Sequence, residues 1–206
     1  MIRRSLFTVL LLPFLLLSCQ AEEKKTDYKQ DQDGVPEGFQ TLTLGAGCFW
    51  CVEAVYQQIE GVHSAVSGYM GGHIANPTYE QVTSKTSGHV EVVQVVYNPE
   101  KLSTEKLLEW FWDLHDPTQA DGQGADIGPQ YLSTIFYHTE EQKKIAEASK
   151  KEAQKKFDKA IATSIKKAKT FYKAEGYHQD FYFLNKNHGY NRAVIAPKLD
   201  KLKLEK

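Results

Sequence analysis

Strand and helix signals alternate along most of this chain, and their order limits the folds that it can adopt. Short apolar runs bounded by Gly, Pro, Asn or Ser predict strands over residues 40–44, 62–68, 90–97 and 131–138. The run 90–97 is the strongest of the four, because Gly88 precedes it and Asn98-Pro99 follows it. Stretches with apolar residues at helical spacing lie between these runs, so the chain has the order strand–helix–strand, twice.

Each predicted helix has a start or stop signal and an apolar stripe. The first closes at Gly61, the second begins at Ser103, and the third begins with a capping box of Thr139 and Gln142. The stripes are Val52, Val55, Tyr56 and Ile59; Leu107, Leu108, Phe111 and Leu114; and Ile145, Ala153, Phe157 and Ile161. The order of elements predicts an α+β fold, a two-layer sandwich with a ferredoxin-like split βαβ core. Its sheet should be mostly antiparallel, with the helices on one face.

Two long segments, 69–87 and 118–130, are rich in Gly and carry no strong apolar pattern. Loops of this length inside a compact domain are usually functional. We therefore expect them to contribute to a site.

The first 38 residues differ from the rest of the chain. Residues 5–17 are almost wholly apolar and follow a short basic start; a bilayer span needs about 20 apolar residues, so this pattern is typical of a signal peptide. The run ends next to Cys19, in a setting that resembles the lipobox of bacterial lipoproteins, in which the cysteine is lipidated. Ordinary secretion with a free Cys19 is the alternative.

These features divide the chain into three parts. We expect a signal peptide over 1–18, a lipid-anchored flexible tether over 19–38, and a globular domain over 39–206. The anchored protein would face the periplasm or the cell surface of an exported bacterial envelope, with the lipid as its only contact with the membrane.

Charge and cysteine content exclude several classes of protein. The 25 basic and 26 acidic side chains nearly cancel, which leaves no global field for nucleic acid, and the lysines of 139–175 are expected on a solvated face. Three cysteines are too few for a disulfide-stapled scaffold, whereas 41% apolar residues suffice for a sizeable core. We expect a monomer.

The chemistry is concentrated in the pair Cys48 and Cys51, where a strand turns through glycines into a helix. The helix N-terminus should lower the pKa of Cys48, and Cys51 follows one turn later on the same face. No second ligand pair supports a zinc site, and Val52 stands where a c-type haem site needs His. A structural disulfide remains an alternative interpretation of this pair. A redox-active pair is favoured, because a bridge between residues so close in sequence removes little conformational entropy from the unfolded chain.

Several separate motifs, in one order, resemble those of the A-type peptide methionine sulfoxide reductases. They are 45–50 with Glu53, 68–72 with 76–79, 88–93, 115–119, 126–131 and 174–179. The resemblance implies thiol-dependent reduction of methionine S-sulfoxide, free or in proteins, for the repair of oxidative damage. It also implies a thioredoxin-type dithiol as reductant and no metal or organic cofactor.

The resemblance also implies roles for individual residues. Cys48 would attack the sulfoxide sulfur, while Glu91, a lone acid in an apolar strand, would protonate the oxygen. Cys51 would convert the Cys48 sulfenic acid to a disulfide, since no cysteine follows it. The other implied residues are the phenols Tyr79 and Tyr131 near the oxygen, Asp126 as a further catalytic group, and Phe49 and Trp50 as the pocket for the substrate methyl group.

The sequence departs from the family pattern at two positions. Many members have Gly at the position of Cys51 and resolving cysteines in a C-terminal tail, and Leu132 replaces a usual Arg.

Two other functions would also account for the cysteine pair and the lipoprotein-type start of the chain. One is a thioredoxin-like disulfide oxidoreductase, which would need a Pro-bearing strand facing the pair. The other is a non-enzymatic binding lipoprotein with a structural Cys48–Cys51 bond.

Overall fold

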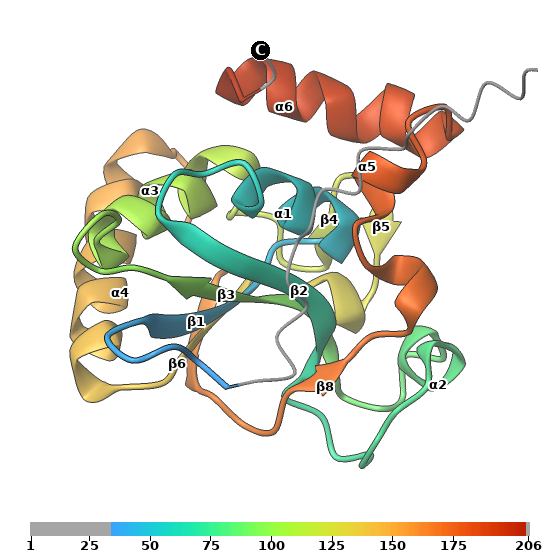
Figure 1. Cartoon of the computed structure of the whole chain (residues 1–206), viewed down its shortest axis with the longest axis horizontal. Coiled ribbons are helices and arrows are strands. Elements are labelled where there is room, and N and C mark those ends of the chain that lie inside the picture. The colour runs from blue at the N-terminus through green and yellow to red at the C-terminus, as the bar shows by residue number, and fades with distance from the viewer. Residues whose placement is uncertain (1–33, 205–206) are drawn as a thin grey trace, which may run out of the picture.

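The computed structural model describes residues 34–204 and has one main sheet with helices packed against it (Figure 1). The sheet has six strands in the order β7-β6-β1-β3-β2-β8. These strands are β1 (Gln40–Gly45), β2 (Val62–Met70), β3 (Val90–Tyr97), β6 (Thr134–Tyr137), β7 (Ser164–Lys167) and β8 (Tyr172–Lys173). A separate short hairpin joins β4 (Gly122–Gln123) to β5 (Asp126–Ile127).

The four central strands, in the order β6-β1-β3-β2, form the core of a ferredoxin-like split βαβ arrangement. Strand β3 pairs antiparallel with both β1 and β2, and β1 pairs antiparallel with β6. Only the β6–β7 pair among the described residues is parallel. The predicted α+β class is therefore confirmed, with β7 and β8 added at the two edges.

Helices α1 (Phe49–Tyr56), α3 (Thr104–Leu114) and α4 (Glu140–Ala153) cover one side of the sheet (Figure 1). The Ser103 hydroxyl accepts a hydrogen bond from the Lys106 N–H, and Thr139 with Gln142 forms a complete capping box, as the sequence predicted. The apolar stripe Leu107, Leu108 and Phe111 of α3 is fully buried in the main core, which also contains residues of β1 and β3.

Strand β3 is apolar on both faces, which decides where its one acid lies. Val93, Val95 and Tyr97 belong to the main core with the helices, whereas Val90 and Val92 pack with Met70 and Phe136 on the opposite face. Successive side chains of a strand alternate between faces, so Glu91 shares the face of Val93 and points toward α1. It is 2% exposed.

Several element boundaries differ from the prediction. Helix α1 ends at Tyr56, before Ile59, and Gly61 lies in the turn that leads into β2. Helix α4 ends at Ala153, so Phe157 and Ile161 lie outside it. A 3-10 turn, η2 (Gln154–Lys156), follows α4, and the Gln154 side chain then bonds the carbonyls of Phe157 and Lys159 and the Ile161 N–H in place of further helical bonds.

The two predicted loops also contain secondary structure. Segment 69–87 begins with the end of β2 and includes the short helix α2 (Tyr79–Thr83), which has its own capping box of Thr78 and Gln81. Segment 118–130 contains the β4–β5 hairpin and runs into the 3-10 turn η1 (Pro129–Tyr131), so β6 begins at Thr134 rather than at Tyr131.

The C-terminal part of the chain returns to α1. It comprises η3 (Gly176–His178), α5 (Phe181–Leu184), the π-helical turn Asn191–Ile195 and α6 (Ala196–Leu202). Figure 1 shows α5 and α6 beside α1 at one end of the molecule. Ile195 and Leu199 are fully buried in the main core, which fixes this segment over the start of α1.

Between residues 34 and 204 no helix is long and apolar enough to cross a bilayer. The expected signal peptide and the lipidated Cys19 lie outside the described residues.

Gly68 of β2 allows a test of how closely β8 and Phe171 pack against the edge of the sheet. A Cβ at this position would lie 2.4 Å from the Phe171 ring and 2.5 Å from the Tyr172 carbonyl oxygen of β8. Gly68→Ala should therefore lower the free energy of unfolding by about 1–3 kcal/mol, the usual cost of overpacking. Urea denaturation measures this change. Gly176→Ala is the control, because no atom lies within 4 Å of its added Cβ, and its stability should match that of the wild type.

Candidate active site

The turn from β1 into α1 carries Cys48 at the N-terminal cap of the helix. Gly47 precedes it with a φ of +89°, and a Cβ there would lie 2.7 Å from the Gln123 side chain, so this turn needs glycine. Cys48 is half-buried, whereas Cys51, one turn into the helix, is only 2% exposed. Both thiols are free.

Glu91 lies directly at the start of α1. Its Oε2 accepts a hydrogen bond of 3.1 Å from the Phe49 N–H, one of the orphan donors at the helix N-terminus. Burial raises the pKa of this carboxyl to about 8, and the Phe49 hydrogen bond opposes the rise only in part. Glu91 is therefore mostly protonated at pH 7, as the sequence predicted for an acid.

The pKa values of the two thiols reverse the prediction from the sequence. The pKa of Cys48 is raised by its hydrogen bond to Cys51, by burial and by the charge of Glu91. The pKa of Cys51 is lowered to about 7, first by the hydrogen bond from Cys48 and then by the positive charge of Lys198. Cys48 gains little from the helix N-terminus because its side chain makes no capping hydrogen bond.

Two phenols from different loops complete the surroundings of Glu91. Tyr79 begins α2 and Tyr131 ends η1. Burial raises the pKa of Tyr79 to about 12 and raises that of Tyr131 still further, and the charges of Glu91 and Cys48 add to both shifts. Both phenols therefore keep their protons at neutral pH and can donate hydrogen bonds to an oxygen beside Cys48.

Aromatic rings form the apolar side of the site. Phe49 is buried, and half-buried Trp50 stacks on Phe181 with ring centroids 3.6 Å apart. The Trp50 Nε1–H donates to Nδ1 of buried His178, whose ring lies 4.6 Å from that of Tyr79. These contacts fix the orientation of Trp50 and give the site a rigid apolar wall.

Glu175 joins three elements around this wall. Its Oε1 accepts the Tyr79 N–H at 2.8 Å, and its Oε2 accepts the Tyr69 hydroxyl at 2.8 Å. The carboxylate therefore holds the start of α2 and the end of β2 next to η3, which contains His178.

The opposite side of the pair opens on a small cavity of about 260 Å³. Tyr190 lies there, with its hydroxyl 3.1 Å from Asp126 Oδ2, to which it donates, and 3.8 Å from Cys51 Sγ. The lining residues are Ala46, Cys48, Cys51, Gln123, Gly124, Ala125, Asp126, Tyr190, Val194 and Lys198. Cys48 therefore lies between an apolar wall with proton donors and a polar cavity that also contains the second thiol.

The fold gathers the residues that the sequence singled out within the domain. Glu91 bonds the residue next to Cys48, Tyr79 and Tyr131 lie within the electrostatic influence of Cys48 and Glu91, Asp126 lines one cavity with Cys48, and Phe49 with Trp50 forms the wall. Cys19 lies outside the described part of the chain. No group of three His, Cys, Asp or Glu side chains within residues 34–204 has the arrangement of a metal site.

Four further residues of the site carry no signal that distinguishes them in the sequence. Tyr190, Phe181 and Lys198 come from the C-terminal segment, after the last matched motif at 174–179. His178 lies within one of the matched motifs, but only its hydrogen bond from Trp50 shows what it does.

Comparisons with known proteins agree with this geometry. A family model described as "Peptide methionine sulfoxide reductase" matches residues 40–206. The peptide methionine sulfoxide reductase MsrA of Saccharolobus solfataricus is 49% identical over 79% of this chain and 92% of its own length. Reduced Mxr1 from Saccharomyces cerevisiae superposes with a TM-score of 0.70 at 34% identity, covering 74% of this chain and 89% of Mxr1. Mxr1 in complex with Trx2 has a TM-score of 0.51 at 28% identity, covering 71% and 86%.

Proposed function

The chain belongs to the peptide methionine sulfoxide reductase family and reduces methionine sulfoxide with thiols, and we propose that Cys48, Glu91 and Cys51 divide this reaction among them. One observation carries the assignment. A protonated, buried carboxyl is hydrogen-bonded to the residue next to a half-buried thiol. Oxygen transfer from a sulfoxide needs these two groups side by side.

The first step transfers oxygen from the substrate to Cys48. The sulfur of Cys48 attacks the sulfoxide sulfur while Glu91 gives its proton to the sulfoxide oxygen. The S–O bond of the substrate breaks and an S–O bond to Cys48 forms, so methionine leaves and Cys48 becomes a sulfenic acid. The Tyr79 and Tyr131 hydroxyls donate hydrogen bonds to the moving oxygen, and the Phe49–Trp50 wall holds the substrate methyl group.

Cys51 acts twice in this scheme. As a thiolate with a pKa of about 7, it takes the proton of Cys48 when the substrate arrives, because the two cysteines lie one helical turn apart and their titrations influence each other. Later, having lost that proton, it attacks the Cys48 sulfenic acid and closes a disulfide with release of water. No cysteine follows Cys51, so it is the candidate resolving thiol.

A thioredoxin-type dithiol then reduces the disulfide. The Mxr1 relative was solved in complex with Trx2, which supports the same kind of partner for this chain. From the family resemblance we propose that the enzyme is selective for the S epimer. We also propose that it acts on both free and protein-bound methionine sulfoxide. We propose that the enzyme works as a monomer.

Glu91→Gln tests the acid. The substitution should lower the rate of sulfoxide reduction about 10²–10⁴-fold, the usual contribution of general acid–base catalysis. In the wild type the rate should fall as pH rises through about 8, because Glu91 loses its proton there. Glu53→Gln is a matched control, since Glu53 is equally buried with a pKa of about 8 but its Oε1 accepts the Ser67 N–H. A loss below threefold in Glu91→Gln at every pH would remove Glu91 from the mechanism.

Substitution of each cysteine separates the two thiols. Cys48→Ser should abolish reduction, because a neutral hydroxyl cannot replace the thiolate or form a sulfenic acid. Cys51→Ser should still release one equivalent of methionine per enzyme, then stall with a thioredoxin-type reductant and recover with dithiothreitol. Burst amplitude and steady-state rate with both reductants measure these effects.

Two results would contradict these assignments. Normal cycling of Cys51→Ser with the protein reductant would show that Cys51 does not resolve the sulfenic acid. A full burst in Cys48→Ser would show that another group accepts the oxygen.

We also propose that the enzyme is exported and lipid-anchored through Cys19, which places it in the bacterial cell envelope. The support is the apolar run 5–17 that ends beside Cys19, followed by the polar segment 20–38. Replacement of Cys19 by Ala should move the protein from membrane to soluble fractions and leave the activity of the purified protein unchanged. An unmodified Cys19 in mass spectra of the native mature protein would refute the anchor.

A further inference from the structure

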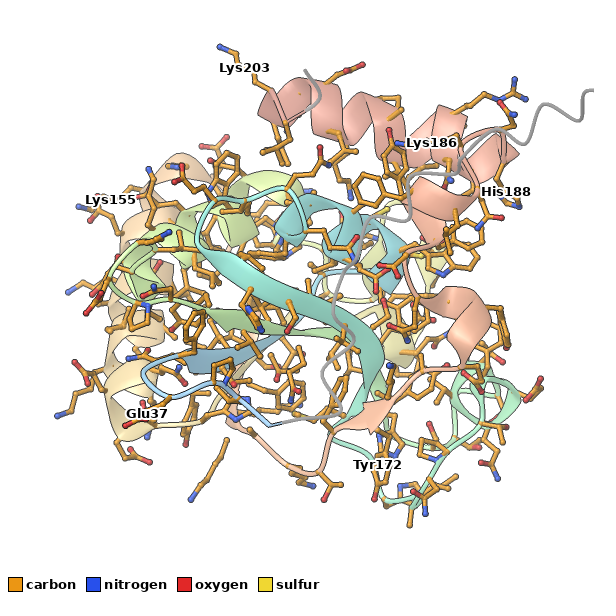
Figure 2. All side chains as sticks on the ribbon, in the orientation of Figure 1. Glu37, Lys155, Tyr172, Lys186, His188 and Lys203 are labelled. Atoms are coloured by element: carbon orange, nitrogen blue, oxygen red, sulfur yellow. The ribbon has the colours of Figure 1, made fainter. Side chains whose placement is uncertain are left out.

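The C-terminal helix places one lysine against the cysteine pair. Ile195 and Leu199 bury one side of the segment, and Lys198 lies one turn after Ile195 on that side. Lys198 is half-buried, whereas Lys201 and Lys203 are exposed. Figure 2 shows Lys203 at the outer end of α6, pointing away from the body of the protein.

Lys198 lines the same 260 Å³ cavity as Cys51, and the mechanism above gives it no task. It forms no ion pair with a carboxylate anywhere in residues 34–204. Asp126 lines the cavity too, but its carboxylate accepts the hydroxyl of Tyr190. Lys198 is the one cation among the residues that line this cavity.

Charges and dipoles around Cys51 act in opposite directions. Burial and the charge of Asp126 disfavour its thiolate, whereas the interaction with the Cys48 thiol and the charge of Lys198 favour it. Once Cys48 has become a sulfenic acid, the thiol hydrogen bond from Cys48 is lost. Lys198 then remains as the group that stabilises the anion, because the hydroxyl hydrogen of Tyr190 is donated to Asp126.

We infer that Lys198 is a positioning residue for disulfide closure, holding Cys51 as the thiolate that attacks the Cys48 sulfenic acid. The inference rests on the proposed roles of the two thiols. In this step the electron pair of the Cys51 thiolate forms the S–S bond and the Cys48 S–O bond breaks. The oxygen leaves with one more proton, taken from solvent, as water. Lys198 transfers no proton and compensates the negative charge of Cys51 until that charge is used.

Lys198→Gln tests this role in the full-length protein. The reduced enzyme is mixed with one equivalent of methionine sulfoxide and no reductant, then quenched with an alkylating agent at intervals. Methionine release reports the first step, and peptide mass spectrometry reports the Cys48 sulfenic acid and the Cys48–Cys51 disulfide. Lys201→Gln is the matched control on the exposed side of α6, and Lys198→Arg restores the charge.

Closure should be slower in Lys198→Gln, and the deficit should depend on pH. Loss of one nearby charge that raises the Cys51 pKa by about one unit lowers the thiolate fraction up to about tenfold when the pH lies below that pKa. The Cys48 sulfenic acid should accumulate correspondingly, while the amount of methionine released stays at one equivalent. The deficit should be smaller at pH 9 than at pH 7, because more of the Cys51 thiol is then ionised in both proteins, and Lys198→Arg should close normally at both pH values.

Two results would overturn the inference. One is closure in Lys198→Gln at the wild-type rate at pH 7, and the other is an equal slowing at pH 7 and pH 9, which indicates a structural defect. A failure of the proposed first step has a different signature, because methionine release would then be absent in every variant, the wild type included.

Discussion

The hydrogen bond between the Phe49 N–H and the Glu91 carboxyl is the interaction on which this site depends. It joins the first residue of α1 to the central strand β3, so the thiol of Cys48 and a proton donor are held together by two rigid elements. It also directs an N–H of the helix N-terminus to the carboxyl rather than to the sulfur. The same contact places the acid beside Cys48, whose pKa is raised by its interaction with Cys51, by burial and by the charge of Glu91.

Burial keeps the Glu91 side of the site protonated. Glu91, Tyr79 and Tyr131 all have raised pKa values, so each can offer a hydrogen rather than a charge. On the cavity side, Lys198 favours an anion at Cys51. The two thiols, one turn apart on α1, lie in opposite electrostatic environments, which suits a pair whose members react in succession.

Much of the fold could be predicted because strand and helix periods differ and their ends carry capping residues. Ser103 and Thr139 cap helices where the sequence indicated, and β3 has the predicted bounds. The errors arose where one side chain replaces backbone bonds over a long span. The apolar residues Phe157 and Ile161 continue the pattern of α4, but hydrogen bonds of Gln154 end the helix before them.

The sequence by itself determined the chemistry available: two thiols one helical turn apart, and one acid within an apolar strand, since both follow from spacing along the chain. It could not determine the face of Glu91, because Val90 and Val92 are as apolar as Val93 and Val95 and alternation looks the same in either register. Only the tertiary structure decided that face. It also decided the order of the thiol pKa values and the presence of Lys198 beside Cys51, because electrostatic effects depend on distances between elements that are remote in sequence.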